Sequence, residues 1–183
     1  MRILYTYTNE RLEDQVKPLR QIVRIAQEWG NNLELVECVK DDDYYHALLE
    51  DWGECTLVNI EQDIVAYPFM IDRMHICPEQ LCVYPYLLRG DRWSVYNIEQ
   101  DVAELPLTPC KWYEKWETVP SWADGSGIGF IKISEEAQQM VDLSEYPVSE
   151  YHWWYLDTWL SYRFHKAGLR FHVHDQAVEH IIS

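Results

Sequence analysis

The chain has 183 residues, 48% of them hydrophobic, so it can bury one sizeable core and is short for two independent domains. Its 31 acidic residues outnumber 15 basic ones and give a formal net charge of −16, which argues against an extended nucleic-acid interface, since that needs clustered Lys and Arg. If the ligand is instead a nucleoside diphosphate, the shortage of cations favours a bound divalent metal as its counter-ion.

The first third of the chain alternates strand and helix patterns. Residues 2–7, 33–39 and 55–60 are expected strands. A helix with an apolar stripe that starts at Val16 should end at Gly30, and a second helix, which aspartates 41–43 can cap, should run through Trp52 to Gly53. Because the third strand is apolar on both faces, this order predicts a parallel sheet covered by helices on both sides.

The remainder of the chain is expected to add shorter elements. The expected strands and extended segments cover residues 81–87, 93–98, 128–133, 170–174 and 177–182. Ser134 can cap a helix that reaches about Asp142, and a long helix should run from near Ser149 to Ala167.

The cysteines and the N-terminus indicate a cellular compartment. The five cysteines form no C-x-x-C pair, which favours reduced, mostly buried thiols over a disulfide framework. No signal-peptide pattern follows Met1, and no stretch is long and apolar enough to cross a bilayer. We therefore expect a cytoplasmic protein without a membrane span.

An acidic pair, Glu61-Gln-Asp63, stands directly after the third strand. Ligands bind beyond the carboxyl ends of strands in such sheets, and residues i and i+2 project to one side, so both carboxylates can reach one hard cation. The pentapeptide at 59–63 recurs at 97–101 after a less apolar run, and we interpret that second copy as chance. An ordinary solvated loop is the alternative for the first copy.

Asp157 lies beside the apolar stripe of the long helix, one turn from both Trp153 and Leu160. Partial desolvation would raise the pKa of its carboxyl and make it a better base for a substrate hydroxyl. An amphipathic-helix residue paired with an Arg or an amide is the alternative interpretation.

Histidines gather near the end of the chain. His172 and His174 share one face of a strand, and Asp175 and His180 follow closely. This group could form a zinc or two-metal hydrolase site, although isolated histidines more often make structural hydrogen bonds.

The strand that ends in Glu61-Gln-Asp63, and the segment 154–168 around Asp157, resemble motifs of GT-A-fold nucleotide-sugar glycosyltransferases. In that family an Asp-x-Asp motif holds a metal against the donor diphosphate, a late histidine returns to the metal, and an aspartate near a helix start deprotonates the acceptor hydroxyl. The resemblance implies metal ligands at Glu61, Asp63 and His180, with His174 as second choice, and a catalytic role for Asp157. The expected cofactor is Mn²⁺ or Mg²⁺, and a histidine ligand favours manganese.

Two of these motifs depart from the family pattern. Glu61 stands where an aspartate is usual, so it could reach the ribose or a metal-bound water instead of the metal, and Leu156 replaces the acid that precedes the catalytic aspartate. The family's element order further implies donor contacts at Tyr7, Thr8 and Asp42. It also implies acceptor contacts at Trp122 and Asp124, which open a glycine-rich segment.

The resemblance implies an α/β Rossmann-like GT-A fold with a mostly parallel central sheet flanked by helices. One domain would span 1–183, with a nucleotide-binding half at 1–65 and an acceptor half at 66–183. The implied function is a metal-dependent, inverting transfer of a sugar from a nucleoside-diphosphate sugar to a glycan or another hydroxyl acceptor. A non-catalytic carbohydrate- or nucleotide-binding domain, and a metal-dependent hydrolase that uses the C-terminal histidines, are the alternatives. The protein could also form a homo-oligomer, because the sequence does not define its oligomeric state.

Overall fold

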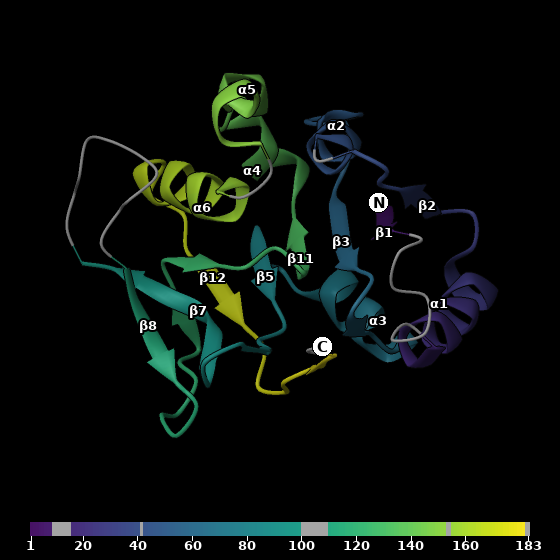
Figure 1. Ribbon diagram of the computed structural model, residues 1–183, viewed down its shortest axis with the longest axis horizontal. Coiled ribbons are helices and arrows are strands. Elements are labelled where there is room, and N and C mark those ends of the chain that lie inside the picture. Colours follow the sequence, from purple (N-terminus) through teal and green to yellow (C-terminus); the bar gives the residue numbers. More distant parts are fainter. Residues whose placement is uncertain (9–15, 41, 100–109, 153–154, 182–183) are drawn as a thin grey trace.

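The computed structural model describes residues 1–8, 16–40, 42–99, 110–152 and 155–181. It contains a seven-stranded central sheet, a four-stranded sheet and a two-stranded ribbon (Figure 1). The strands of the central sheet are β1 (Arg2–Tyr7), β2 (Leu33–Glu37), β3 (Leu57–Glu61), β5 (Leu81–Val83), β9 (Trp122–Ala123), β11 (Phe130–Ile133) and β12 (Phe171–Val173).

The remaining elements lie around that sheet. The four-stranded sheet consists of β6 (Leu87–Leu88), β7 (Arg92–Ile98), β8 (Cys110–Glu114) and β10 (Gly125–Ser126). The ribbon pairs β4 (Ile64–Val65) with β13 (Glu179–His180). The helices are α1 (Val16–Trp29), α2 (Asp43–Leu49), α3 (Pro68–Ile76), α4 (Glu135–Gln139), the 3₁₀ turn η2 (Leu143–Glu145), α5 (Val148–Tyr151) and α6 (Leu156–Lys166).

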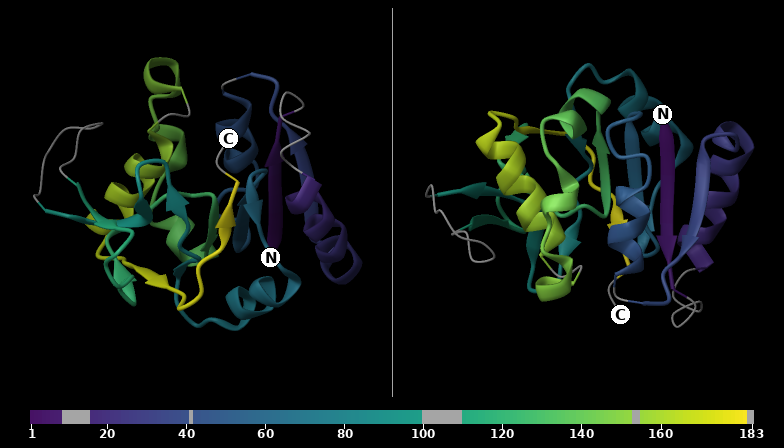
Figure 2. Two further views of the ribbon diagram at one scale, coloured as in Figure 1. Left: turned by 60° about the horizontal axis from the view of Figure 1, so that its bottom comes forward. Right: turned by 90° about the horizontal axis from the view of Figure 1, so that it is seen from above.

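The central sheet separates two hydrophobic cores. Side chains alternate along β1, so that Leu4 packs into the core beneath α2, α4 and α6, while Ile3 and Tyr5 pack into the core beneath α1 and α3. Figure 2 shows α2 and α6 on one side of the sheet and α3 on the other. The α/β class predicted from the sequence is confirmed.

The expected β-α-β-α-β order at the start of the chain is also confirmed. β1 pairs in parallel with both β2 and β3, in the register Thr6 to Val36 and Thr6 to Glu61. The carboxyl ends of these three strands therefore meet at one edge of the sheet.

The sheet as a whole is mixed, in the order β2-β1-β3-β11-β5-β12-β9. β11 runs antiparallel to both of its neighbours, β3 and β5, and β9 runs antiparallel to β12. The reason is that β5 leads into the four-stranded sheet rather than into a crossover helix. The chain then re-enters the central sheet from the carboxyl edge, so β11 must run in the opposite direction.

The helices are shorter than the periodicity suggests. The predicted helix from Ser149 to Ala167 is wrong in one respect: it is two helices, α5 and α6, and the chain turns at His152, which has φ 51° and ψ −141°. Ser134 does cap α4, because its Oγ accepts the Ala137 N–H at 3.2 Å.

No helix in the described ranges combines the length and apolar character that crossing a membrane requires.

The buried face of α1 also differs from the expected stripe. Val16 and Val23 are 50% and 60% exposed, whereas Ile22 and Ile25 are buried. The buried positions follow the three- and four-residue spacing that continues from Pro18, and this spacing places Val23 on the opposite side of the helix.

Candidate functional site

The carboxyl end of β3 brings Glu61 to the edge of the central sheet, and Asp63 lies in the turn that leads to β4. The β4–β13 ribbon pairs Ile64 with His180, and the Ile181 N–H donates to the Asp63 carbonyl at 2.8 Å. As a result, His180 Nε2 lies 3.1 Å from Asp63 Oδ2. The structure therefore brings together two of the three residues proposed as metal ligands, Asp63 and His180. Within the described residues, Glu61 does not converge with them into a group of closely spaced ligand atoms.

The orientation of the His180 ring is set by the backbone of β6. His180 Nδ1 lies 2.7 Å from the Leu87 carbonyl oxygen, so Nδ1 carries a proton and Nε2 faces the carboxylate. Burial opposes the charged imidazolium, but the bonds to Asp63 and Leu87 outweigh burial and raise the pKa of His180 above its ordinary value. Nε2 thus either shares a proton with Asp63 or offers its lone pair to a cation.

The two carboxylate oxygens of Asp63 differ in their surroundings, and only Oδ2 faces His180. Oδ1 is buried, and no hydrogen-bond donor reaches it among the residues that the structure describes. A buried acceptor left in this state costs free energy, which a bound cation would recover. This oxygen and the adjacent imidazole nitrogen are chemically suited to hold a divalent metal.

Glu61 is held by a buried polar network. The Tyr44 hydroxyl donates to Glu61 Oε1 at 2.9 Å and accepts from Asn59 Nδ2, also at 2.9 Å. The Asn59 amide is in turn held by the Ile128 carbonyl at 2.6 Å. Burial first, and the charge of Asp63 second, raise the pKa of Glu61 to about 7.

Asp157 lies in the first turn of α6 and is partly buried. Its Oδ1 accepts the backbone N–H of Thr158 at 2.6 Å. Burial raises the pKa of Asp157, although the bonds from Thr158 act in the opposite direction. The negative charge of Asp157 also contributes to the raised pKa of Glu61 and of Tyr86, after burial and closer groups.

The glycine-rich segment that begins at Trp122 contacts Glu61 at Gly129. Its carbonyl accepts the Glu61 N–H at 2.8 Å and its N–H donates to the Tyr86 hydroxyl at 3.1 Å. A Cβ at position 129 would lie 2.7 Å from the Tyr86 hydroxyl and 3.0 Å from Glu61 Oε2. Only glycine allows this close an approach to the site.

The proposed donor contacts surround the same edge of the sheet. Tyr7 ends β1, and the Thr8 N–H donates to Gln62 Oε1 at 2.5 Å, so both residues lie next to the acidic turn. Asp42 lies immediately before α2 and its Oδ1 is 3.0 Å from His152 Nδ1.

Trp122 and Asp124 are not brought to the carboxylates. Trp122 lies in β9, four strand positions from β3, which corresponds to about 19 Å across the sheet. Asp124 accepts from Arg170 Nε at 2.8 Å and from the Ile98 N–H at 3.1 Å. Its carboxylate therefore connects the end of β7 with the residue that precedes β12.

The C-terminal histidines divide between two places. His180 joins Asp63, whereas His172 and His174 lie next to Cys77 and Cys82. Asp175 is 81% exposed and pairs with Arg73. The structure therefore does not assemble the His172–His174–Asp175–His180 group that the sequence suggested.

Three site residues were missed at the level of sequence. Tyr44 and Asn59 support Glu61, and Tyr86 lies between Gly129 and the edge of the His180 ring, with ring centroids 5.1 Å apart. Asn59 carries a signal, because it is a polar residue inside an apolar strand. The two tyrosines carry none, since aromatic residues are common in any core.

Comparison with known proteins supports the fold. No protein-family model and no curated protein matches this sequence. Solved structures do match: A197 from STIV aligns with a TM-score of 0.62 at 16% identity, over 100% of this chain and 87% of that one. A glycosyltransferase involved in the glycosylation of the major capsid of PBCV-1 aligns with a TM-score of 0.52 at 11% identity, over 99% of this chain and 93% of that one.

The chain has a GT-A-like fold. The resemblance inferred from the sequence is thereby confirmed at the level of fold. The GT-A-like sheet places Glu61 and Asp63 at the carboxyl end of β3, where α/β proteins bind their ligands. Fold similarity at this identity does not define an activity, which must be argued from the site.

Proposed function

We propose that the protein is a metal-dependent glycosyltransferase that moves a sugar from a nucleoside-diphosphate sugar to an acceptor hydroxyl, with inversion at the anomeric carbon. The observation that carries this proposal is the Asp63–His180 pair, with the unpartnered Asp63 Oδ1, at the carboxyl end of a central strand in a GT-A-like fold.

Asp63 and His180 would hold the divalent cation, and Glu61 would support it from the same side. The imidazole nitrogen favours Mn²⁺ over Mg²⁺, which prefers oxygen ligands. When bound, the cation would neutralise the charge of the departing nucleoside diphosphate. Because one Glu61 oxygen already accepts from Tyr44, only its second oxygen is available for a ribose hydroxyl or a metal-bound water.

The protein's own residues fix the geometry of that site. The Leu87 carbonyl holds the His180 tautomer, and the Tyr44–Asn59 network holds the Glu61 side chain. Tyr7, Thr8 and Asp42 are the proposed contacts for the nucleoside, because they flank the acidic turn. Trp122 and Asp124 receive no support from the geometry as acceptor contacts.

Asp157 is the proposed general base. The acceptor oxygen attacks the anomeric carbon, its proton passes to the Asp157 carboxylate, and the bond from the anomeric carbon to the phosphate oxygen breaks. A raised pKa makes Asp157 a stronger base than an exposed aspartate. Thr158 holds one carboxylate oxygen, which leaves the other for the acceptor hydroxyl.

The test is a titration of UDP, GDP and their sugars into the full chain, with and without Mn²⁺. The proposal expects binding of a nucleoside diphosphate that requires the metal. Binding that is independent of metal would favour a non-catalytic binding domain. No binding of any nucleoside diphosphate at millimolar metal would contradict the transferase.

A further inference from the structure

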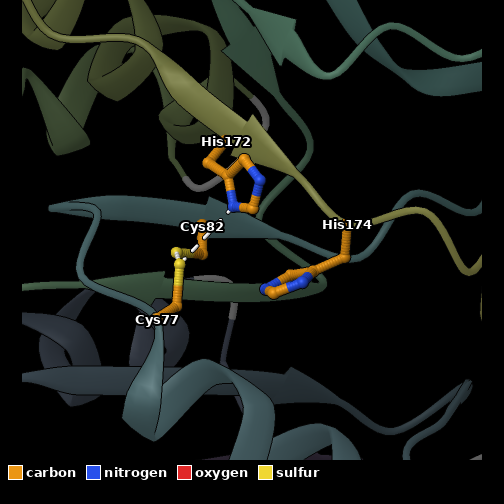
Figure 3. A group of neighbouring side chains, drawn as sticks. All are labelled: Cys77, Cys82, His172 and His174. Carbon is orange, nitrogen blue, oxygen red and sulfur yellow. Dashed lines mark hydrogen bonds between the residues drawn. The ribbon is translucent and has the colours of Figure 1, made fainter.

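A second group of metal-ligating side chains lies away from the acidic turn. Cys77, Cys82, His172 and His174, here called the Cys/His cluster, converge on one another in Figure 3. The proposed function uses none of them. The two cysteines precede the two histidines by 90 residues or more in the sequence.

Backbone pairing places the four residues together. Cys77 caps the C-terminus of α3, and Cys82 lies in the middle of β5. His172 is the parallel partner of Cys82 in the β5–β12 ladder, so both side chains point to the same face of the sheet. His174 follows two residues later and returns to that face.

The four ligand atoms lie close enough together to reach a single small cation. One ligand atom from each residue lies within 4.8 Å of all the others, with Cys77 Sγ 3.4 Å from His172 Nδ1 and 2.8 Å from Cys82 Sγ. Tetrahedral zinc with two sulfur and two nitrogen ligands separates those ligand atoms by roughly 3.3–3.8 Å. The sulfur–nitrogen distance lies in this range, whereas the two sulfurs are closer and would have to move apart by about 1 Å to bind zinc. A disulfide would bring the two sulfurs to about 2.05 Å, well below the observed separation.

His174 adds an independent indication of a ligand. Its Nε2 is buried and has no hydrogen-bond partner in the described part of the chain, and the ring is fixed by stacking on Tyr84, with centroids 4.4 Å apart. A buried imidazole nitrogen in this state either costs free energy or binds something. The neighbouring groups that it faces are those of the Cys/His cluster.

A buried lysine lies beside the Cys/His cluster. Lys132 is only 5% exposed, and its ammonium donates to the Cys77 carbonyl oxygen at 2.7 Å. Burial raises the pKa of the Cys82 thiol, and Lys132 offsets only part of that effect. A metal that binds the sulfurs would itself displace their protons. Thiolate and imidazole together suit zinc rather than the manganese or magnesium expected at the carboxylates.

We propose that Cys77, Cys82, His172 and His174 bind one Zn²⁺ in a closed, tetrahedral structural site. Four protein ligands leave no position for substrate or water, so this zinc holds the fold and performs no hydrolysis. It links the C-terminus of α3 and the strand β5 to β12, the strand that directs the chain back toward β13 and His180.

The test counts zinc in tag-free protein kept in a non-thiol reductant, and then titrates Co²⁺ into the metal-free chain. Wild-type protein is expected to hold one zinc per chain and to show a thiolate-to-cobalt charge-transfer band with tetrahedral ligand-field bands. His172→Gln and Cys82→Ser should lose both signals. Cys55→Ser, which removes a thiol outside the cluster, should keep them.

A check on folding and one further variant separate loss of the zinc site from other effects. Cys82 is fully buried and its substitution could unfold the chain, so partly exposed His172 is the decisive position, with circular dichroism as the check on folding. Asp63→Asn should keep its zinc, which separates this site from the proposed transferase site. The proposal is overturned if reduced wild-type protein holds no zinc, if His172→Gln retains the cobalt spectrum, or if Cys77 and Cys82 are recovered as a disulfide.

Discussion

His180 Nε2 lies 3.1 Å from Asp63 Oδ2, although 117 residues separate the two in the chain. The β4–β13 ribbon creates this contact, and the Leu87 carbonyl fixes which imidazole nitrogen faces the carboxylate. The second oxygen of Asp63 is buried, and none of the described residues donates to it. The Asp63 carboxylate and His180 Nε2 are therefore placed to hold a proton or a metal cation between them.

Asp63→Asn is expected to weaken metal-coupled binding of a nucleoside diphosphate by ~100-fold, because a buried charge that faces an imidazole is removed while the shape is kept. Isothermal titration with Mn²⁺ and UDP or GDP measures this change. Asp72→Asn, on the exposed side of α3, is the matched control and should bind like wild type. If both variants bound the nucleoside diphosphate with equal affinity, Asp63 would not be a metal ligand.

Asp157→Asn is expected to lower kcat by about 10²–10⁴-fold while donor affinity is retained, since the asparagine still accepts from Thr158 but cannot take a proton. Sugar transfer and donor binding are measured on the same preparation. Asp142→Asn is a suitable control, because Asp142 also accepts a backbone N–H at a helix start, from Ser144 at 3.0 Å. A loss of donor binding in Asp157→Asn would argue against the role of base.

Tyr44→Phe is expected to lower the free energy of unfolding by about 1–3 kcal/mol, because the buried Glu61 carboxylate and the Asn59 amide both lose a partner. Urea unfolding measures this loss, and donor titration should show weaker binding as Glu61 is released. Tyr45→Phe removes a neighbouring hydroxyl whose bond to the Leu143 carbonyl is 3.3 Å long. Donor affinity should be unchanged in that control; a parallel drop in both variants would indicate a packing effect alone.

The carboxylate of Asp43 should make stability depend on pH. Backbone N–H groups of Lys40 and Val39 donate to it and hold the pKa of Asp43 below its ordinary value. Its contribution is therefore fully present above the unfolded-state pKa of about 3.9 and is lost as pH falls through the lower folded-state pKa.

Urea midpoints of wild type and Asp43→Asn, compared across pH, test this expectation. The asparagine keeps a neutral acceptor, so the comparison isolates the charge. The gap between the two midpoints should be widest near neutral pH and should close in acid. A gap that stays constant with pH would contradict the assignment.

Local patterns predicted the first third of the fold well. The strands β1, β2 and β3 and the helices between them follow from apolar periodicity and glycine stops, because these signals act over a few residues. The break at His152 and the antiparallel direction of β11 were not predictable in this way. The first depends on a backbone conformation that tertiary packing imposes, and the second on the route of the chain through another sheet.

The sequence by itself determined the class of the fold and an acidic pair at a strand's carboxyl end, because strand periodicity and the i, i+2 geometry are local properties of the chain. Only the tertiary structure decided the partners of those acids: Tyr44 for Glu61 and His180 for Asp63. It also separated His172 and His174 from His180 and placed them with two cysteines. Contacts between such distant residues depend on strand order and register, which no short pattern in the sequence encodes.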